Sequence, residues 1–361
     1  MSFLPDSSRH VLVVHPGSLG DVLLSLPTLC AIRQLWPSRG LTLAARGEIG
    51  GFLQQCREID QSLSLDGAAW SSLWTLGGNV PAELRRLFEQ CDAAVAWLAR
   101  GQEEMTTLFT SAGIGDVRIG SPHGAGLRSV HQAERYGEAV RIGIQPDSAD
   151  CRLALPESMV KEGARLLAKQ GVDPSSVVVI VHPGSGSRHK CLPPSRLCEV
   201  ISAAAERGWR PVMVGGPADG NLVALVQEGL TKPVSTVTNL PLSAVAGLLT
   251  HATAYLGHDS GLTHLAALLG VPTIAMFGPT DPTRWAPRGW NVQVLRGTDC
   301  LCRGWEAVAD CVEKPCLSIS CSDLIKACEY AIYRGENQPH VSPCQAPSAC
   351  SDKSRCAKVA S

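Results

Sequence analysis

The sequence predicts an α/β protein with two similar halves, each a parallel sheet covered by helices on both faces. The tetrapeptide His-Pro-Gly-Ser occurs at 15–18 and again at 182–185, each time after an apolar β-branched run. Short apolar runs without polar alternation follow in both halves and are separated by helical patterns, as in strands buried on both faces. The 361 residues are also too many for one typical domain and suit two.

The first half opens with HVLVVHPGSLGD, His10–Asp21, which predicts a first strand, a loop and a helix start. The helix that follows has a core face including Leu24 and Ile32, and Pro27 should kink it. Further strands are expected at Leu41–Arg46, Ser62–Leu65, Ala93–Leu98 and Val117–Ser121.

The second half repeats the design with VVVIVHPGSGSRHK, Val177–Lys190. Strands are expected at Arg210–Gly215, Val234–Thr238, Ala254–Gly257, Thr273–Phe277 and Val292–Leu295. Helices are expected at Glu157–Gln170, Ser195–Arg207, Asn221–Glu228, Ser243–His251 and Asp323–Tyr333. The polar, turn-rich stretch Gln145–Pro156 predicts the join, which gives domains at 1–148 and 149–320. The Pro- and Ser-rich tail, 335–361, is expected to be disordered.

Composition narrows the function classes. Apolar residues make up 45% of the chain, and the formal net charge is -1, which argues against a nucleic-acid binder that relies on a global basic field. The N-terminus lacks the basic start and long apolar run of a signal peptide, and no run of 18 apolar residues predicts a transmembrane helix. We therefore expect a cytoplasmic protein.

The stretch LGHDSGLTHLAALLGVPTIAMFGPTDP, Leu256–Pro282, carries polar residues where a predicted strand ends and a helix begins. Gly261 would allow a tight turn into that helix. The free backbone amides at the helix start, near Ser260-Gly261, would suit a phosphate. Asp259 is better suited to sugar hydroxyls, and His264 can donate to a diphosphate oxygen. The alternative interpretation is an ordinary strand–helix turn in which Asp259 is the N-cap.

The stretch HPGSGSRHKCLPPSRL, His182–Leu197, combines glycines with a cation. Gly184 and Gly186 would let the backbone approach a ligand, and Lys190 supplies a compact positive charge. The spacing fits neither a Walker loop nor G-x-G-x-x-G. A flexible glycine loop with a surface lysine is the alternative.

The stretch GSLGDVLLSLPTLCAIRQLWP, Gly17–Pro37, places Asp21 at the N-terminus of a predicted helix. The carboxylate can be a helix-dipole partner only, or it can face a cleft as a base. All three stretches follow the carboxyl ends of predicted strands. Two such sheets facing each other would form one cleft, with a phosphate-binding wall on one side and Asp21 on the other.

These three stretches, in this order and separation, resemble glycosyltransferase family 9, the ADP-heptose:lipopolysaccharide heptosyltransferases, over roughly residues 10–330. The resemblance implies the GT-B fold of two Rossmann-like domains facing across a cleft, with Asp21 as general base. It implies that Asp259 holds donor hydroxyls. It also implies donor binding by Ser185, Gly186, Lys190, Ser260, Gly261 and His264.

The resemblance further implies an inverting transferase that needs no metal or other cofactor. The expected donor is ADP-heptose, and the expected acceptor is an anionic lipopolysaccharide core glycolipid on the inner leaflet, reached by a peripheral enzyme. The last helix, 321–334, is expected to cross back onto the first domain. Two positions depart from the family pattern on the donor side: Leu192 replaces a frequent aromatic residue, and His258 replaces a frequent Asn.

Two other functions remain open from the residues. A GT-B nucleotide-sugar 2-epimerase would act on the donor alone, and an inactive nucleotide-sugar-binding module would bind without turnover. Arg118, Arg128, Arg135 and Arg141 could meet an anionic acceptor, although the neighbouring Glu134 and Glu138 favour an ordinary solvated helix face.

The cysteines after residue 299 have no C-x₂-C pairs, which argues against a zinc site. Six lie before the tail, at Cys300, Cys302, Cys311, Cys316, Cys321 and Cys328.

Overall fold

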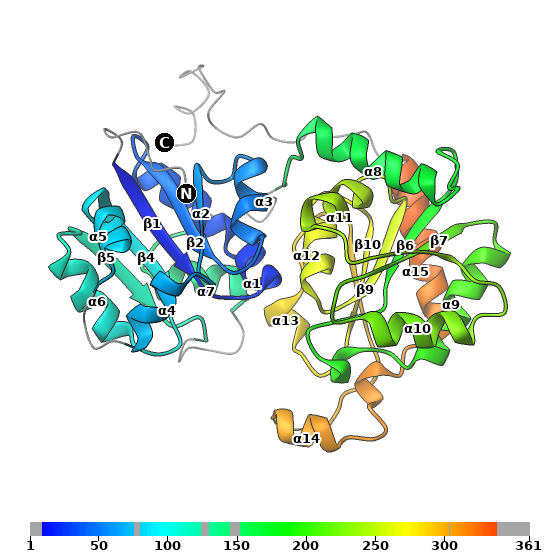
Figure 1. Ribbon diagram of the computed structural model, residues 1–361. Helices are drawn as coiled ribbons and strands as arrows, with labels where there is room; N and C mark the ends of the chain where they lie inside the picture. The colour runs from blue at the N-terminus through cyan, green and yellow to red at the C-terminus, as the bar shows by residue number, and fades with distance from the viewer. Residues whose placement is uncertain (1–8, 76–79, 124–129, 145–151, 303, 338–361) are drawn as a thin grey trace, which may run out of the picture.

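The computed structural model describes residues 9–75, 80–123, 130–144, 152–302 and 304–337. It contains two sheets, and every pairing between the described strands is parallel. Helices cover both faces of each sheet, and the two units lie side by side (Figure 1). The predicted fold class is therefore confirmed.

The first sheet has five strands in the order β3-β2-β1-β4-β5. They are β1 His10–His15, β2 Gly40–Ala45, β3 Gln61–Ser64, β4 Cys91–Trp97 and β5 Asp116–Gly120. One face is covered by α4 Ala68–Thr75, α5 Ala82–Glu89 and α6 Gln102–Ser111. The other is covered by α1 Leu19–Leu24, α2 Leu26–Leu35, α3 Ile49–Gln55 and α7 Gln132–Ala139. The order places the reversal of strand sequence between β1 and β4.

The kink expected at Pro27 is a break between two helices. Ser25 ends α1 and also precedes α2, and Pro27 occupies the second position of α2. Proline is tolerated there because the first amides of a helix have no intrahelical acceptor. The Ser25 hydroxyl donates to the Val22 carbonyl at 2.8 Å and so satisfies one of the carbonyls at the end of α1.

The second sheet has six strands in the order β11-β10-β9-β6-β7-β8. They are β6 Val178–His182, β7 Arg210–Gly215, β8 Ser235–Thr238, β9 Ala254–His258, β10 Thr273–Phe277 and β11 Val292–Arg296. The helices of the unit are α8 Glu157–Lys169, α9 Pro194–Glu206, α10 Gly220–Gly229, α11 Leu242–Leu249, α12 Gly261–Leu268 and α13 Pro282–Trp285. The order is that of a Rossmann fold, with its reversal between β6 and β9.

The last helix, α15 Cys321–Asn337, does not return to the first domain as expected. It packs beside α9 on the face of the second sheet opposite α12 (Figure 1). Gln293 Nε2 donates to the Ala327 carbonyl at 3.1 Å, and Arg207 pairs with Glu329 at 2.8 Å. The physical reason is the burial of apolar side chains. Helix α12 covers one face of β9 and β10, and α15 covers the opposite face. The buried residues of α15 include Leu324, Ile325, Cys328 and Ala331.

Two other boundary predictions have partial outcomes. Helix α8 begins at Glu157, as expected after the predicted join, while residues 145–151 of that join lie outside the described part of the chain. Residues 338–361 of the predicted disordered tail also lie outside it, and α15 runs three residues past its expected end at 334.

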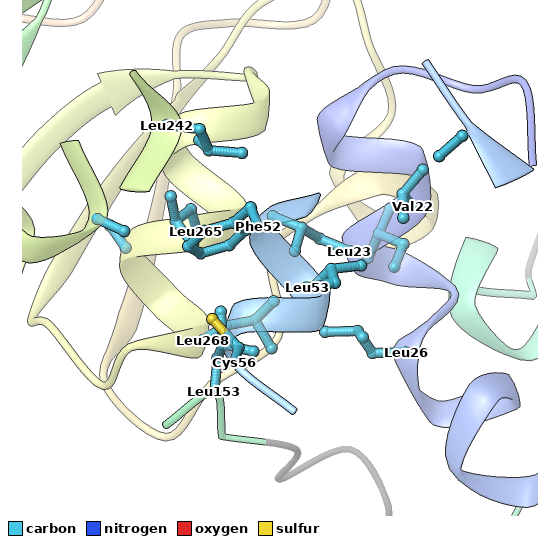
Figure 2. Close-up of a cluster of buried hydrophobic side chains, with 14 of the residues drawn as sticks. Val22, Leu23, Leu26, Phe52, Leu53, Cys56, Leu153, Leu242, Leu265 and Leu268 are labelled. Carbon is cyan, nitrogen blue, oxygen red and sulfur yellow. The ribbon is translucent and has the colours of Figure 1, made fainter. Parts of the chain in front are cut away.

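An apolar cluster joins the two units. Figure 2 shows Val22 and Leu23 of α1 and Phe52 of α3 in one group with Leu242 of α11 and Leu265 of α12. All five are buried, so the two sheets share part of one core.

Polar contacts at the edges of this cluster also join the two units. Glu48 accepts from the Leu242 amide at 2.9 Å, and Arg288 pairs with Glu134.

Two glycines, Gly20 and Gly261, let α1 and α12 of the two units approach each other closely. A Cβ on Gly261 would lie 2.8 Å from Leu19 Cβ and 3.1 Å from the Gly20 amide nitrogen. Gly261 therefore makes room for the first unit, where the sequence suggested a tight turn. A Cβ on Gly20 would in turn lie 3.1 Å from the His264 ring.

Replacing Gly261 with alanine is expected to destabilise the protein by about 1–3 kcal/mol, because overpacking forces α1 and α12 apart. Gly220→Ala is the matched control, since Gly220 is also the first residue of a helix and a Cβ there meets open space. Urea unfolding of both variants measures the difference. Equal midpoints for the two variants would contradict the close packing.

Candidate functional site

A cavity of about 730 Å³ lies where the carboxyl ends of both sheets face each other. Residues of both units line it. They include every residue to which the family resemblance assigned a catalytic or donor-binding role: Asp21, Ser185, Gly186, Lys190, Asp259, Ser260, Gly261 and His264.

The topology explains why these residues meet. Lys190 follows β6 and Asp259 follows β9, the two strands between which the second sheet reverses its order. Asp21 follows β1, which lies at the reversal of the first sheet. Loops diverge at such a reversal and leave a crevice, which is where open α/β sheets bind ligands.

Lys190 and Asp259 form an ion pair in the wall of the cavity. Lys190 Nζ lies 2.7 Å from Asp259 Oδ2, and the Thr280 hydroxyl donates to the same oxygen at 2.7 Å. The side chains of Lys190 and Asp259 are only 19% and 9% exposed, so the surface-lysine alternative is wrong. The N-cap of α12 is Ser260, so the alternative of Asp259 as an N-cap is also wrong.

A second carboxylate, Asp219, also lines the cavity and was not predicted. It accepts from the Gly216 amide at 2.7 Å and contacts His182 Nε2 at 3.2 Å. The other nitrogen of His182 lies 3.3 Å from the Ser260 hydroxyl. Burial raises the pKa of Asp219, but hydrogen bonds from His182 and Gly216 outweigh it and leave this pKa below its usual range. Asp219 lies in the turn after β7, and this position after the end of a strand could have identified it in the sequence.

Gly184 leaves the space that the Asp219 carboxylate occupies. A Cβ on Gly184 would lie 1.8 Å from Asp219 Oδ1, so the missing side chain makes room for Asp219. A Cβ on Gly186, in contrast, would meet nothing within 4 Å, and Gly186 lines the cavity. The sequence had predicted for both glycines that the backbone approaches a ligand.

Asp21 projects from the first turn of α1 on the opposite side of the cavity. Its Oδ2 accepts from the Ser18 amide at 3.0 Å and the Ser18 hydroxyl at 2.6 Å, and its Oδ1 accepts from the Tyr136 hydroxyl at 2.9 Å. Asp21 therefore does stabilise the start of α1, as the alternative interpretation of this carboxylate proposed. Burial raises the pKa of Asp21, but the hydrogen bonds from Ser18 and Tyr136 outweigh it and hold this pKa below its usual range. Asp21 is therefore ionised at neutral pH.

His264 is buried and contributes no charge to the site at neutral pH. Burial lowers its pKa to about 4, and the neighbouring Asp259 offsets only part of that effect. It can still donate or accept one hydrogen bond as a neutral imidazole.

The two departures from the family pattern contact each other beneath the site. The Leu192 amide donates to His258 Nε2 at 2.8 Å, and both residues are buried. Burial lowers the pKa of His258 to about 3, so it is neutral. Neither residue lines the cavity, so the pair belongs to the packing of the loop that carries Lys190.

Several cavity residues gave no signal in the sequence. Trp305 places its ring 5.8 Å from Lys190 Nζ. Arg284 lines the cavity from α13 and donates to Gln132 of the first unit at 3.0 Å. The others include Glu48, Thr280 and Trp285. They come from loops and short helices whose position depends on the packing of the two units.

The arginines considered for acceptor binding are largely engaged elsewhere. Arg118 pairs with Asp116 at 2.9 Å, and Arg135 is buried and donates to the His123 carbonyl. Arg141 is exposed, and Arg128 lies outside the described residues. Among the described helices, none is long and apolar enough to cross a bilayer.

Two Rossmann-like units with the carboxyl edges of both sheets lining one cavity define the GT-B architecture. Residues 144–313 match glycosyltransferase family 9 (heptosyltransferase). Lipopolysaccharide heptosyltransferase 1 of Pseudomonas aeruginosa is 32% identical over 353 residues, covering 85% of this chain and 87% of that protein. Lipopolysaccharide heptosyltransferase 3 of Escherichia coli is 26% identical over 297 residues, covering 77% and 84%. The chain belongs to glycosyltransferase family 9.

Solved structures of the family share the fold. A family 9 glycosyltransferase from Veillonella parvula superposes with a TM-score of 0.75 at 19% identity, covering 90% of this chain and 98% of that one. The E. coli ADP-heptose lipopolysaccharide heptosyltransferase II gives 0.69 at 18% identity, covering 91% and 100%.

Proposed function

We propose that this protein transfers a heptose from a nucleotide-diphosphate donor, with ADP-heptose the expected one, to a lipopolysaccharide core acceptor. Family membership supports the reaction class, and both relatives named above are lipopolysaccharide heptosyltransferases. The acceptor is an anionic glycolipid, so the enzyme would work in the cytoplasm at the surface of the inner membrane.

One observation carries the proposal: a cation and a helix N-terminus lie on one side of the cavity, and an ionised carboxylate lies on the other. The first amides of α12, at Gly261 and Leu262, have no intrahelical acceptor and line the cavity. Together with Lys190 they suit a diphosphate. Asp259 Oδ1 takes no hydrogen bond from the described residues and would accept one from a donor hydroxyl.

In the proposed reaction Asp21 takes the proton of the acceptor hydroxyl as its oxygen forms a bond to the anomeric carbon. The bond from that carbon to the diphosphate breaks, and its electron pair leaves with the diphosphate. Lys190 and the α12 amides stabilise the developing negative charge without requiring a metal ion. Attack from the face opposite the leaving group inverts the anomeric centre.

The proposal is tested by incubating the protein with ADP-heptose, with and without a heptose-deficient lipopolysaccharide core. We expect ADP release and a mass increase of one heptose on the acceptor only when both substrates are present. Conversion of the donor alone to an isomeric nucleotide sugar would favour the 2-epimerase. Donor binding without turnover against any core acceptor would indicate an inactive binding module.

A further inference from the structure

The segment between β11 and α15, residues 297–320, has little core of its own. It carries α14 Trp305–Asp310 and a 3-10 turn at Pro315–Leu317, and α14 lies away from both sheets (Figure 1). Leu301 and Val312 are 98% and 93% exposed. A segment this short with so few buried apolar groups needs another source of stability.

Cysteines converge inside this segment. The sulfurs of Cys300, Cys302 and Cys311 all lie within 4.8 Å of one another. Cys300 Sγ is 2.8 Å from that of Cys302 and 3.9 Å from that of Cys311. Cys316 lies outside this group of three, and its thiol interacts with Cys300. Three sulfurs therefore come together, with a fourth thiol interacting with one of them, although the sequence has no C-x₂-C pair.

The backbone is built to bring the fourth cysteine in. The Gly297 amide donates to the Cys316 carbonyl at 2.9 Å. A Cβ on Gly297 would lie 2.2 Å from the Pro315 carbonyl oxygen, so this approach requires glycine. The turn that carries Cys316 is thus fixed against the end of β11.

We propose that Cys300, Cys302, Cys311 and Cys316 together bind one metal ion that prefers thiolates, either Zn²⁺ or Fe²⁺. A tetrahedral set of four thiolates suits both ions. Metal–sulfur bonds of about 2.3 Å place neighbouring sulfurs about 3.8 Å apart in such a set. The separation of 3.9 Å between Cys300 and Cys311 fits that geometry, whereas the 2.8 Å between Cys300 and Cys302 is shorter, so a bound ion would move these two sulfurs apart. None of the four cysteines lines the cavity, so the ion would be structural.

The segment also connects this metal site to the cavity. Trp305 lies between Cys302 and Cys311 in the sequence, begins α14 and lines the cavity beside Lys190. A bound ion would hold the Trp305 ring at the place where the donor is expected. This consequence rests on the proposed function, whereas the metal site itself does not.

Elemental analysis of the full-length protein, purified under reducing conditions without chelator, tests the metal site. We expect about one equivalent of zinc plus iron per chain, and the analysis tells the two metals apart. The double variant Cys302→Ser/Cys311→Ser should hold at least about tenfold less metal. Cys321→Ser is the control, because Cys321 lies at the start of α15 outside the cluster, and it should keep the metal.

If the double variant does not fold, cobalt(II) substitution of the wild-type protein gives an independent measurement. Tetrahedral thiolate coordination predicts a cobalt–thiolate charge-transfer spectrum that Cys321→Ser retains. Metal-free wild-type protein after growth with both metals, or a disulfide between Cys300 and Cys302 in that protein, would overturn the proposal.

Donor binding separates the metal site from the proposed function. Chelation should weaken ADP-heptose affinity about as much as Trp305→Ala, while Trp305→Ala keeps its metal. A metal-loaded protein that does not bind the donor would count against the proposed function and leave the metal site intact. If chelation leaves donor affinity unchanged, the claim that the metal positions the Trp305 ring is wrong.

Discussion

Asp21→Asn is expected to lower the rate of sugar transfer about a thousandfold while leaving donor affinity nearly unchanged. A positioned general base contributes roughly 10²–10⁴-fold to such a rate, and an amide cannot take the proton. Asn keeps an acceptor for Ser18, so the start of α1 should remain intact. Single-turnover transfer and calorimetric titration with the donor give the two quantities separately.

Asp281→Asn is the matched control for this variant. Asp281 is likewise a hydrogen-bonded carboxylate at a helix start, accepting from the Thr283 amide at 2.9 Å and its hydroxyl at 2.7 Å, but it does not line the cavity. Transfer by Asp281→Asn should stay near wild type. Full activity of Asp21→Asn would show that another group removes the proton.

The lowered pKa of Asp21 gives this result a pH dependence. Because folding depresses the pKa, the carboxylate contributes stability above the pKa of an unfolded aspartate, about 3.9, and that contribution is lost as pH falls through the folded pKa. Between pH 5 and 8 Asp21 stays ionised, so its protonation should cause no fall in rate. The difference in unfolding free energy between wild type and Asp21→Asn should be larger at pH 7 than in acid.

Lys190→Met is the second variant with a large expected effect. It removes the cation that faces the diphosphate, and it also removes the ion-pair partner of the buried Asp259 carboxylate. Hydrogen bonds to charged groups contribute about 1.5–3 kcal/mol, so donor affinity should fall roughly 10- to 150-fold. The buried Asp259 carboxylate would keep only Thr280, which should cost about 2 kcal/mol of stability.

A double variant separates these two losses. Adding Asp259→Asn to Lys190→Met removes the stranded charge, so stability should recover while donor affinity stays low. Lys161→Met is the control, since Lys161 and Glu157 also lie 2.7 Å apart but are 73% and 80% exposed. Isothermal titration and urea unfolding measure both effects. A Lys190→Met protein that binds the donor normally would remove the lysine from the site.

The sequence predicted the strands well because buried parallel strands are short apolar runs bounded by turn residues. β7 and β10 match their predicted ranges, and the other strands for which a range was predicted agree within two residues at each end. The candidate site was also predictable in large part. Parallel strands end at one edge, so Asp21, Lys190 and Asp259, each just after a strand, were expected to converge.

Residues that act through contacts distant in sequence were the ones whose roles differ from the prediction. Gly261 was assigned to a turn, but its missing side chain is needed against Leu19 of the other unit. Asp259 was considered as a cap, but its partners Lys190 and Thr280 lie on two other loops. The last helix was placed on the first domain, although the uncovered face of the second sheet takes its apolar side.

The amino-acid order alone determined two parallel sheets and the polar groups at their carboxyl ends, because strand periodicity and turn chemistry are local. The tertiary structure decided which of these groups pair, how Tyr136 and Ser18 hold Asp21, and that three cysteines without zinc-site spacing meet in the segment before the last helix. These outcomes depend on how the loops and helices of each unit pack against one another, and no local pattern encodes that geometry.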